Sequence, residues 1–214
     1  MNHDTIDDKT WLEAQDAEAR YHFPDFYSYE NTIKNYEWSY KNYFKWFNIK
    51  TSKKFKSILE IGPALVSGCE FVDCEKRTII EPLFTESMMQ KHPETRKHHA
   101  RLLESNVEIF TGAAEDFDDY GSYEEVWMFN VLQHVKNPTT ILEKAMEAKV
   151  VRVFEPIDLP VDTQYGGAHP HELTKETFSC MINGAGQLNA KMYQPSGIEN
   201  FHGVPCYTCV YIRN

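Results

Sequence analysis

The chain has 214 residues, of which 42% are hydrophobic, enough for one globular domain with a full core. No stretch approaches the roughly 20 consecutive apolar residues of a membrane-spanning helix, and the polar, acidic start MNHDTIDDKT does not resemble a secretory signal. We therefore expect a cytoplasmic protein with no membrane contact. The formal net charge of −10 excludes a broadly basic surface and so disfavours nucleic acid as a partner.

The first 50 residues predict two helices that are rich in aromatic side chains. Residues 10–22 carry bulky groups at helical spacing, and an amphipathic helix is expected from Ile33 to Phe47. The aromatic side chains either pack on the protein core or form a lid over a small-molecule pocket. We expect residues 1–50 to form a helical lid and residues 51–214 to form the main domain.

Four lysines follow this region, at positions 50, 53, 54 and 56. Such a cluster can form a local patch for nucleic acid, but a solvated linker is the more common role of a short charged run. We expect a linker here.

From Ser57 onward, short apolar runs alternate with helical patterns, which indicates a parallel sheet covered by helices on both faces. The expected strands are Ser57–Ile61, Thr78–Ile80, Val107–Phe110, Glu125–Phe129, Val150–Phe154, Asn189–Tyr193 and Pro205–Ile212. The expected helices are Leu83–Lys91, Thr139–Ala148 and Thr174–Ile182. The sequence thus predicts an α/β fold with a mostly parallel, seven-stranded sheet.

The five cysteines are Cys69, Cys74, Cys180, Cys206 and Cys209. An odd number of cysteines argues against a disulfide framework. The last two have the spacing of a zinc-binding pair, but they lie in the strand-like run CYTCVYI, which would direct them to opposite faces. We expect reduced cysteines packed in the core.

The ends of the expected strands carry the residues with chemical interest. In SILEIGPALVSG, Gly62 permits a tight turn from the first strand into a following helix. In an open α/β sheet this turn lies at the topological switch point, where ligands bind. Glu81 ends the next strand, about 20 residues after Glu60, where a carboxylate can accept both hydroxyls of a ribose. The third and fourth strands end in FTGAAED and MFNVLQHV, so four strand ends should converge on one crevice.

Between Ser57 and Phe178 the sequence resembles the class I S-adenosylmethionine-dependent methyltransferases. The resemblance is carried by LEIGPA, by IIEPL with its ribose-binding acid, by the adenine segment GAAED and, most specifically, by WMFNVLQHVKNP. The helix TWLEAQDAE and the tripeptide EPL are similar to a subgroup of small-molecule and sugar methyltransferases whose N-terminal helix covers the cofactor. The resemblance implies a Rossmann-like, doubly wound fold with an N-terminal helical lid and S-adenosyl-L-methionine as cofactor.

The resemblance also implies which residues contact the cofactor. They are Glu60, Gly62, Pro63 and Ala64 after the first strand, Glu81 and Pro82 after the second, Ala114 and Glu115 after the third, and Asn130 and Val131 after the fourth. Two positions depart from the family pattern. Ala64 replaces a customary glycine near the methionine end of the cofactor, and Ala113 stands where many relatives carry an aspartate near the adenine. Glu115 or a backbone amide must therefore recognise that ring.

Three histidines are candidates for the chemistry. A hydroxyl acceptor needs a base with a pKa near the working pH, which suits histidine. His134 follows the fourth strand, beside the expected methyl group, as either that base or a structural histidine under the cofactor. His169 and His171 lie in GGAHPHELT, where relatives often place groups that bind the acceptor. Those two histidines alone lack the further ligands of a metal site, so no metal is expected.

The expected function is methyl transfer to a hydroxyl or amine of a small polar metabolite, such as a sugar. One alternative is a catalytically silent cofactor-binding or interaction protein on the same fold. A less favoured alternative is an RNA methyltransferase. The fourth motif lacks Asn/Asp-Pro-Pro-Tyr and a Pro-Cys dipeptide, which disfavours methylation of nucleobases.

Overall fold

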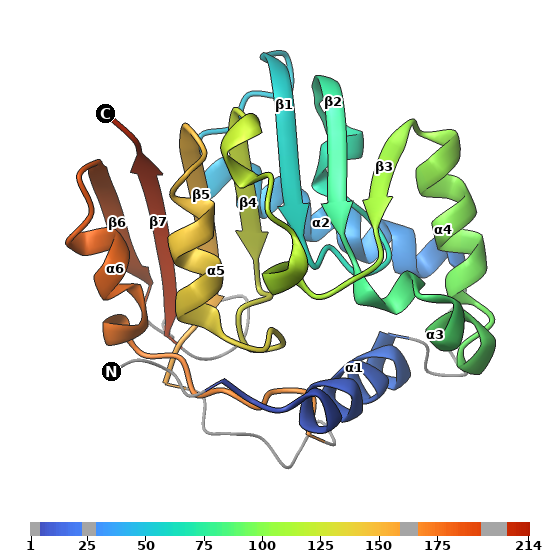
Figure 1. Cartoon of the computed structure of the whole chain (residues 1–214). Helices are drawn as coiled ribbons and strands as arrows, with labels where there is room; N and C mark the ends of the chain where they lie inside the picture. The colour runs from blue at the N-terminus through green and yellow to red at the C-terminus, as the bar shows by residue number, and fades with distance from the viewer. Residues whose placement is uncertain (1–4, 23–28, 159–166, 194–204) are drawn as a thin grey trace.

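A seven-stranded sheet forms the centre of the computed structural model, which describes residues 5–22, 29–158, 167–193 and 205–214. The strands are β1 (Lys54–Ile61), β2 (Asp73–Ile80), β3 (Val107–Phe110), β4 (Glu125–Phe129), β5 (Val150–Pro156), β6 (Gln187–Tyr193) and β7 (Cys206–Ile212). Their order is β3-β2-β1-β4-β5-β7-β6 (Figure 1). The pairings among β1 to β5 are parallel, and β7 runs antiparallel to both of its neighbours. The expected mostly parallel, seven-stranded sheet is confirmed.

Helices cover both faces of the sheet (Figure 1). The α-helices are α1 (Asp8–His22), α2 (Tyr29–Trp46), α3 (Glu86–Lys91), α4 (Thr95–Glu104), α5 (Pro138–Ala145) and α6 (Ser179–Ile182). The 3-10 turns are η1 (Gly68–Phe71), η2 (Pro82–Phe84), η3 (Ala114–Asp116), η4 (Tyr120–Ser122) and η5 (Lys175–Phe178). α5 and α6 pack on one face, α2 packs on the other, and α4 lies beside β3.

Strand alternation sorts the apolar side chains between two cores. In β1, Leu59 and Ile61 belong to the cluster under α5, whereas Ile58 belongs to the cluster under α2. In β7, Cys209 joins the first cluster and Cys206 joins the second. The two cysteines therefore point to opposite faces of the sheet, as the sequence predicted, and all five cysteines of the chain are free thiols.

α2 is part of the hydrophobic core. Its side chains Tyr43 and Phe44 pack on β4, where the ring centroids of Tyr43 and Phe129 are 4.9 Å apart and those of Phe44 and Trp127 are 5.7 Å apart. Buried aromatic rings contribute much of the stability of a core because each removes a large apolar area from water. In α2 the buried aromatic residues thus pack on the core, whereas Trp38 is exposed. Tyr27, from the same aromatic-rich stretch, lies outside the described residues.

α1 lies across the carboxyl ends of the strands (Figure 1). Near its start, Asp8 forms an ion pair of 2.7 Å with Lys136 in the loop after β4. Farther along, Asp16 pairs with Lys91 and His92 at the end of α3, at 2.6 and 2.8 Å. α1 is therefore fastened at two places over the edge of the sheet where α/β folds bind ligands.

The helix expected after Gly62 does not form. The chain instead makes the four-residue turn η1, and β2 begins soon afterwards at Asp73. The face of the sheet where such a helix would pack is already covered by α2, which precedes β1 in the chain. The expectation of a helix after Gly62 was wrong, because the residues around β1 do not indicate which helix of the chain packs on that strand.

α4 is a helix that the sequence analysis did not predict. Its buried residues Thr95, His98 and Leu102 have helical spacing, but only Leu102 is strongly apolar, so the periodic signal is weak. Two expected helices also prove to be shorter, because Leu83–Lys91 and Thr174–Ile182 each divide into a 3-10 turn and a short α-helix.

The lysine cluster is only partly a linker. Lys50 and Lys53 lie in the segment between α2 and β1, as expected, but Lys54 and Lys56 belong to β1, which begins before its apolar run. Lys54 forms an ion pair of 2.9 Å with Glu75, and Lys53 forms one of 3.1 Å with Glu125. Acidic partners on neighbouring strands thus offset the positive charge of these two lysines.

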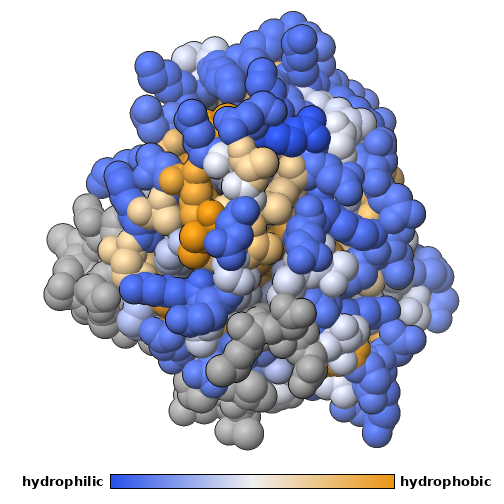
Figure 2. Space-filling model, turned by 60° about the vertical axis from the view of Figure 1, so that its left-hand side comes forward, coloured by the Kyte–Doolittle hydropathy of each residue, from blue (hydrophilic) through white to orange (hydrophobic). Residues whose placement is uncertain are grey.

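The surface is mostly hydrophilic, with one area of apolar surface on the face shown in Figure 2. The large apolar side chains exposed among the described residues are Leu12, Tyr21, Trp38, Leu103, Ile182 and Ile212. Leu12 and Tyr21 come from α1 and the other four from four further elements, and isolated apolar side chains of this kind are common on folded proteins. Within the described ranges, no helix is long and apolar enough to cross a membrane.

Phe44→Ala should lower the free energy of unfolding by about 3–5 kcal/mol, because it removes a buried ring between α2 and β4. Lys45→Ala, at an exposed position of the same helix, is the matched control and should change stability by less than about 0.5 kcal/mol. Urea denaturation measures both. If the two variants were equally stable, α2 would be a detachable cap and not part of the core.

Candidate active site

A cavity of about 640 Å³ opens at the carboxyl ends of the strands, beside α1 and α2. Among the described residues its lining comprises Trp11, Gln15, Glu18 and residues 20–22 of α1; Thr32, Asn35, Tyr36, Ser39, Tyr40 and Tyr43 of α2; and residues 61–64, 80–83, 114–115, 129–131 and 134–135. The ends of β1, β2 and β4 and the turn that follows β3 therefore meet at one cavity. The size lies within the usual range of small-molecule sites.

Gly62 allows the turn after β1 to pass close to the turn after β4. Its φ is +59°, and a Cβ atom at this position would lie 2.1 Å from a methyl carbon of Val131. Its N–H donates a hydrogen bond of 2.8 Å to the carbonyl of Ile80, at the end of β2. Only glycine satisfies both the positive φ and the close approach.

Ala64 adopts a backbone conformation that normally favours glycine. Its φ is +55°, in the left-handed region, which costs an L-residue with a Cβ about 1–2 kcal/mol. Its N–H donates a hydrogen bond of 2.6 Å to Oε2 of Glu81. This bond to a buried carboxylate compensates for the strain and fixes the turn.

Glu81 links two of the turns that form the cavity. It is 2% exposed, and its Oε1 accepts the N–H of Leu83 at 3.0 Å while Oε2 accepts the N–H of Ala64. Burial raises the pKa of Glu81 to about 7, although the two N–H donors and nearby His22 act in the opposite direction. A buried carboxyl group with a perturbed pKa on a cavity wall is a candidate for ligand binding.

Glu115 lines the cavity and carries a buried carboxylate oxygen that has no partner among the described residues. Its Oε1 accepts the N–H of Asn137 at 2.7 Å, whereas its buried Oε2 has no hydrogen-bond partner in the described part of the chain. Burial raises the pKa of this carboxyl group. Because buried polar atoms are normally paired, Oε2 is suited to accept a hydrogen bond from a ligand.

Glu155 holds the turn after β4, and the sequence analysis missed it. This fully buried carboxylate at the end of β5 accepts the N–H groups of Val131 and Leu132 at 2.9 and 3.0 Å. Burial raises its pKa to about 8. The turn begins with Asn130 at φ +61°, a conformation that asparagine tolerates better than most residues. A charged residue inside the apolar run VRVFEP was the available sequence signal.

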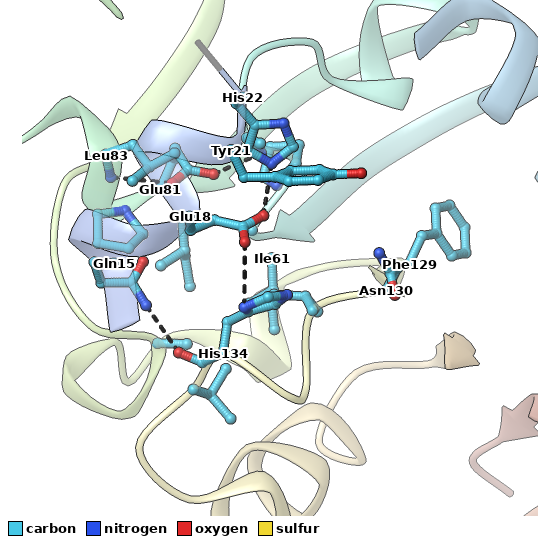
Figure 3. Close-up of a pocket in the computed structure, with 18 of the residues that line it drawn as sticks. Gln15, Glu18, Tyr21, His22, Ile61, Glu81, Leu83, Phe129, Asn130 and His134 are labelled. Carbon is cyan, nitrogen blue, oxygen red and sulfur yellow. Dashed lines mark hydrogen bonds and ion pairs between the residues drawn. The ribbon is translucent and has the colours of Figure 1, made fainter. Parts of the chain in front are cut away.

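α1 meets the turn after β4 through polar side chains (Figure 3). The amide of Gln15 donates a hydrogen bond of 2.9 Å to the carbonyl of His134, and Oε2 of Glu18 lies 3.6 Å from Nδ1 of His134. The other oxygen of Glu18 contacts Nε2 of His22 at 2.6 Å. Burial would raise the pKa of Glu18, but the imidazoles of His134, His22 and His169 lower it well below its usual range. Glu18 was not foreseen, because no spacing rule connects α1 with residue 134.

The three candidate histidines occupy different environments. His134 lines the cavity, and its ring centroid is 4.8 Å from that of His169. His171 is buried, its Nε2 lies 2.9 Å from the carbonyl oxygen of Val135, and it is not among the described residues that line the cavity. The geometry thus brings His134 and His169 together and leaves His171 outside.

Glu60 is directed into the protein and is absent from the described cavity lining. Its carboxylate accepts hydrogen bonds from the hydroxyls of Tyr40, at 2.8 Å, and Ser67. Burial raises its pKa to about 7. In β1, Glu60 shares a face with Ile58, the face covered by α2, because side chains two positions apart in a strand point the same way. Glu60 therefore joins α2 to the turn after β1.

The chain matches no protein-family model and no curated protein. It does match solved structures. The plantazolicin methyltransferase BpumL, in complex with a triazolic desmethylPZN analog and S-adenosylhomocysteine, is 14% identical, with 98% of this chain and 100% of that chain covered and a TM-score of 0.55. The N-methyltransferase NodS from Bradyrhizobium japonicum, in complex with S-adenosylhomocysteine, is 11% identical, with coverages of 96% and 99% and a TM-score of 0.57.

An rRNA methylase from Streptococcus thermophilus also matches, at 12% identity, with coverages of 83% and 95% and a TM-score of 0.50. At identities this low, the finding is a shared fold. The chain has the Rossmann-like fold of the class I methyltransferases, which confirms the fold that the sequence resemblance implied.

Ala64→Gly should raise the free energy of unfolding by about 1 kcal/mol, because glycine adopts a positive φ without the clash of a Cβ atom. Ala113→Gly is the matched control: Ala113 is also buried but has φ −68°, so glycine there should destabilise the protein. Chemical denaturation of both variants distinguishes the two effects. Equal destabilisation by both substitutions would show that the turn at Ala64 is unstrained.

Proposed function

We propose that the protein binds S-adenosyl-L-methionine in this cavity and transfers its methyl group to a hydroxyl or amine of a small polar acceptor. The observation that carries the proposal is the buried carboxylate of Glu81, at the end of β2 and on the wall of a cavity of suitable size. In dinucleotide-binding and related folds, an acid at this position accepts hydrogen bonds from ribose hydroxyls. The shared fold supports the same assignment.

The residues around the cavity fit the cofactor. Each oxygen of Glu81 accepts one backbone N–H, and a carboxylate oxygen has a further lone pair for a ribose hydroxyl. The unpartnered Oε2 of Glu115 can accept a hydrogen bond from the adenine amino group. The turn from Gly62 to Ala64 contacts Glu81 through the N–H of Ala64 and passes close to Val131, and it would hold the methionine part. When bound, the cofactor would supply an electrophilic methyl group on a sulfonium.

The acceptor would enter beside α1 and the turn after β4. Transfer of a methyl group is an in-line displacement, so the chain mainly has to position the nucleophile and remove its proton. Glu18 and His134 supply a carboxylate and an imidazole at this end of the cavity (Figure 3). Tyrosines 21, 36, 40 and 43 supply apolar ring faces with polar tips, which suits a small acceptor with both characters. α1 would act as the lid of the site.

A catalytically silent cofactor-binding protein is the second candidate. One observation favours it: Ala64 carries a Cβ atom in the turn after β1, where the family pattern has a glycine near the methionine end of the cofactor. A methyl-transfer assay over a panel of small hydroxyl and amine compounds separates the two candidates. RNA is a less suitable acceptor for a chain with a net charge of −10, although an rRNA methylase shares the fold.

Glu81→Gln should weaken the binding of S-adenosylmethionine by about 1.5–3 kcal/mol, because an amide cannot replace the charged acceptor of two hydroxyls. Isothermal titration calorimetry measures the affinity. Glu86→Gln is the matched control, because Glu86 is exposed on α3 and outside the described cavity lining. Unchanged affinity in a folded Glu81→Gln protein would remove Glu81 from the site.

The pH dependence of the same titration provides a further check on Glu81. The free protein carries this carboxyl group with a pKa of about 7, and ribose hydroxyls that donate to the ionised form would lower that pKa. Cofactor binding should then release a proton, and affinity should rise with pH up to about 7 and level off above it. The Glu81→Gln variant lacks this contribution, so the difference between the two pH profiles isolates it.

His134→Ala should lower turnover about 100-fold or more while cofactor affinity changes little, because removal of the acceptor proton matters in the transition state. Steady-state rates at saturating substrates and calorimetry with the cofactor measure the two effects. His99→Ala, a partly buried histidine outside the described lining, is the control. Equal turnover in His134→Ala and wild-type protein would rule out a role in deprotonation.

A further inference from the structure

Three potential metal ligands from distant parts of the chain meet at the acceptor end of the cavity. They are Glu18 in α1, His134 after β4, and His169 in the segment that precedes η5. One ligand atom of each lies within 4.8 Å of the others. We propose that Glu18, His134 and His169 bind a divalent transition-metal ion, with zinc as the best-suited ion. The sequence analysis expected no metal because it considered His169 and His171 without a third group.

The donor set has the composition of a catalytic metal site. Two imidazoles and one carboxylate are a common ligand set for zinc in enzymes, and imidazole favours transition metals over magnesium. Structural zinc sites normally have four protein ligands, whereas catalytic sites have three and keep one position for water or substrate. A three-ligand site on the edge of a cavity corresponds to the second type.

The ring of His134 is held in place beside the other two ligands. Its Nδ1 lies 2.9 Å from the carbonyl oxygen of Ala168 and 3.6 Å from Oε2 of Glu18, and its ring centroid is 4.8 Å from that of His169. Ala168 directly precedes His169, so the same backbone segment orients one ligand and presents another.

Glu18 is oriented in the same manner. Its Oε1 is held by Nε2 of His22 at 2.6 Å, which leaves Oε2 on the side of His134, 3.6 Å from Nδ1 of that ring. Tyr36 in turn holds His22, with its hydroxyl 2.9 Å from Nδ1.

The separations are close to those of a bound site. With metal–ligand distances near 2.1 Å, tetrahedral geometry places ligand atoms about 3.4 Å apart. The three groups are within 4.8 Å of one another, so binding requires the ligand atoms to approach by at most about 1.4 Å. Rotation of side chains suffices for such a change, because His169 is only partly buried.

The role of the ion depends on the proposed function, whereas its binding does not. With the ion bound, His134 acts as a ligand and not as the base. The metal ion itself lowers the pKa of a bound acceptor hydroxyl and thus prepares it for methyl transfer. The site also needs α1, because this helix carries the ligand Glu18. α1 would then have a second task besides covering the cavity, since docking it would complete the metal site.

The test is a calorimetric titration of Zn²⁺ into the full chain after treatment with a chelator. We expect one site that Glu18→Gln and His169→Ala each weaken by about 100-fold or more. His99→Ala is the matched control and should bind Zn²⁺ like the wild type, and Mg²⁺ should bind far more weakly than Zn²⁺. Anomalous diffraction from crystals grown with Zn²⁺ should place the ion between the three ligands.

Two results would overturn the proposal. One is the absence of any zinc binding that Glu18→Gln or His169→Ala weakens. The other is an anomalous peak elsewhere in the molecule. Parallel titrations with S-adenosylmethionine keep this outcome separate from the proposed function. If the protein binds the cofactor but not zinc, the metal site is refuted and the proposed methyltransferase function stands. If wild-type and Glu81→Gln protein both bind zinc and the wild type does not bind the cofactor, the methyltransferase function is refuted and the metal site stands.

Discussion

The buried carboxylate of Glu81 is the constraint on which the rest of the site depends. Its two oxygens accept the N–H groups of Ala64 and Leu83, so one side chain fixes the turns after β1 and β2 relative to each other. This bond allows Ala64 to hold a positive φ where glycine would be unstrained. Burial of the ionised carboxylate costs free energy, which is why its pKa is raised, and hydrogen bonds from ligand hydroxyls would offset that cost.

The two N-terminal helices have different tasks. α2 replaces the helix that does not form after β1, and its aromatic rings complete one face of the core. α1 instead lies across the strand ends and reaches the cavity with Gln15 and Glu18 (Figure 3). It is attached by the ion pairs of Asp8 and Asp16 and by the buried alanines Ala14, Ala17 and Ala19, the last of which belongs to the core cluster under α2. α1 is thus a packed cover over the cavity.

Much of the site could be predicted from the sequence because strand ends in a parallel sheet meet at one edge. Gly62, Glu81 and Asn130 each follow an apolar run, and this local pattern was enough to place them at the cavity. Glu60 also ends such a run, but strand alternation turns it toward α2. The contact of Glu18 with His134 depends on where α1 docks, which is a tertiary property that no local pattern encodes.

The most direct test of the account is a crystal structure of the protein with S-adenosylhomocysteine. The account predicts that the ribose hydroxyls bind the carboxylate of Glu81, that the adenine amino group approaches Oε2 of Glu115, and that the sulfur faces His134. Electron density for the ligand outside this cavity, or a ribose that makes no contact with Glu81, would contradict it.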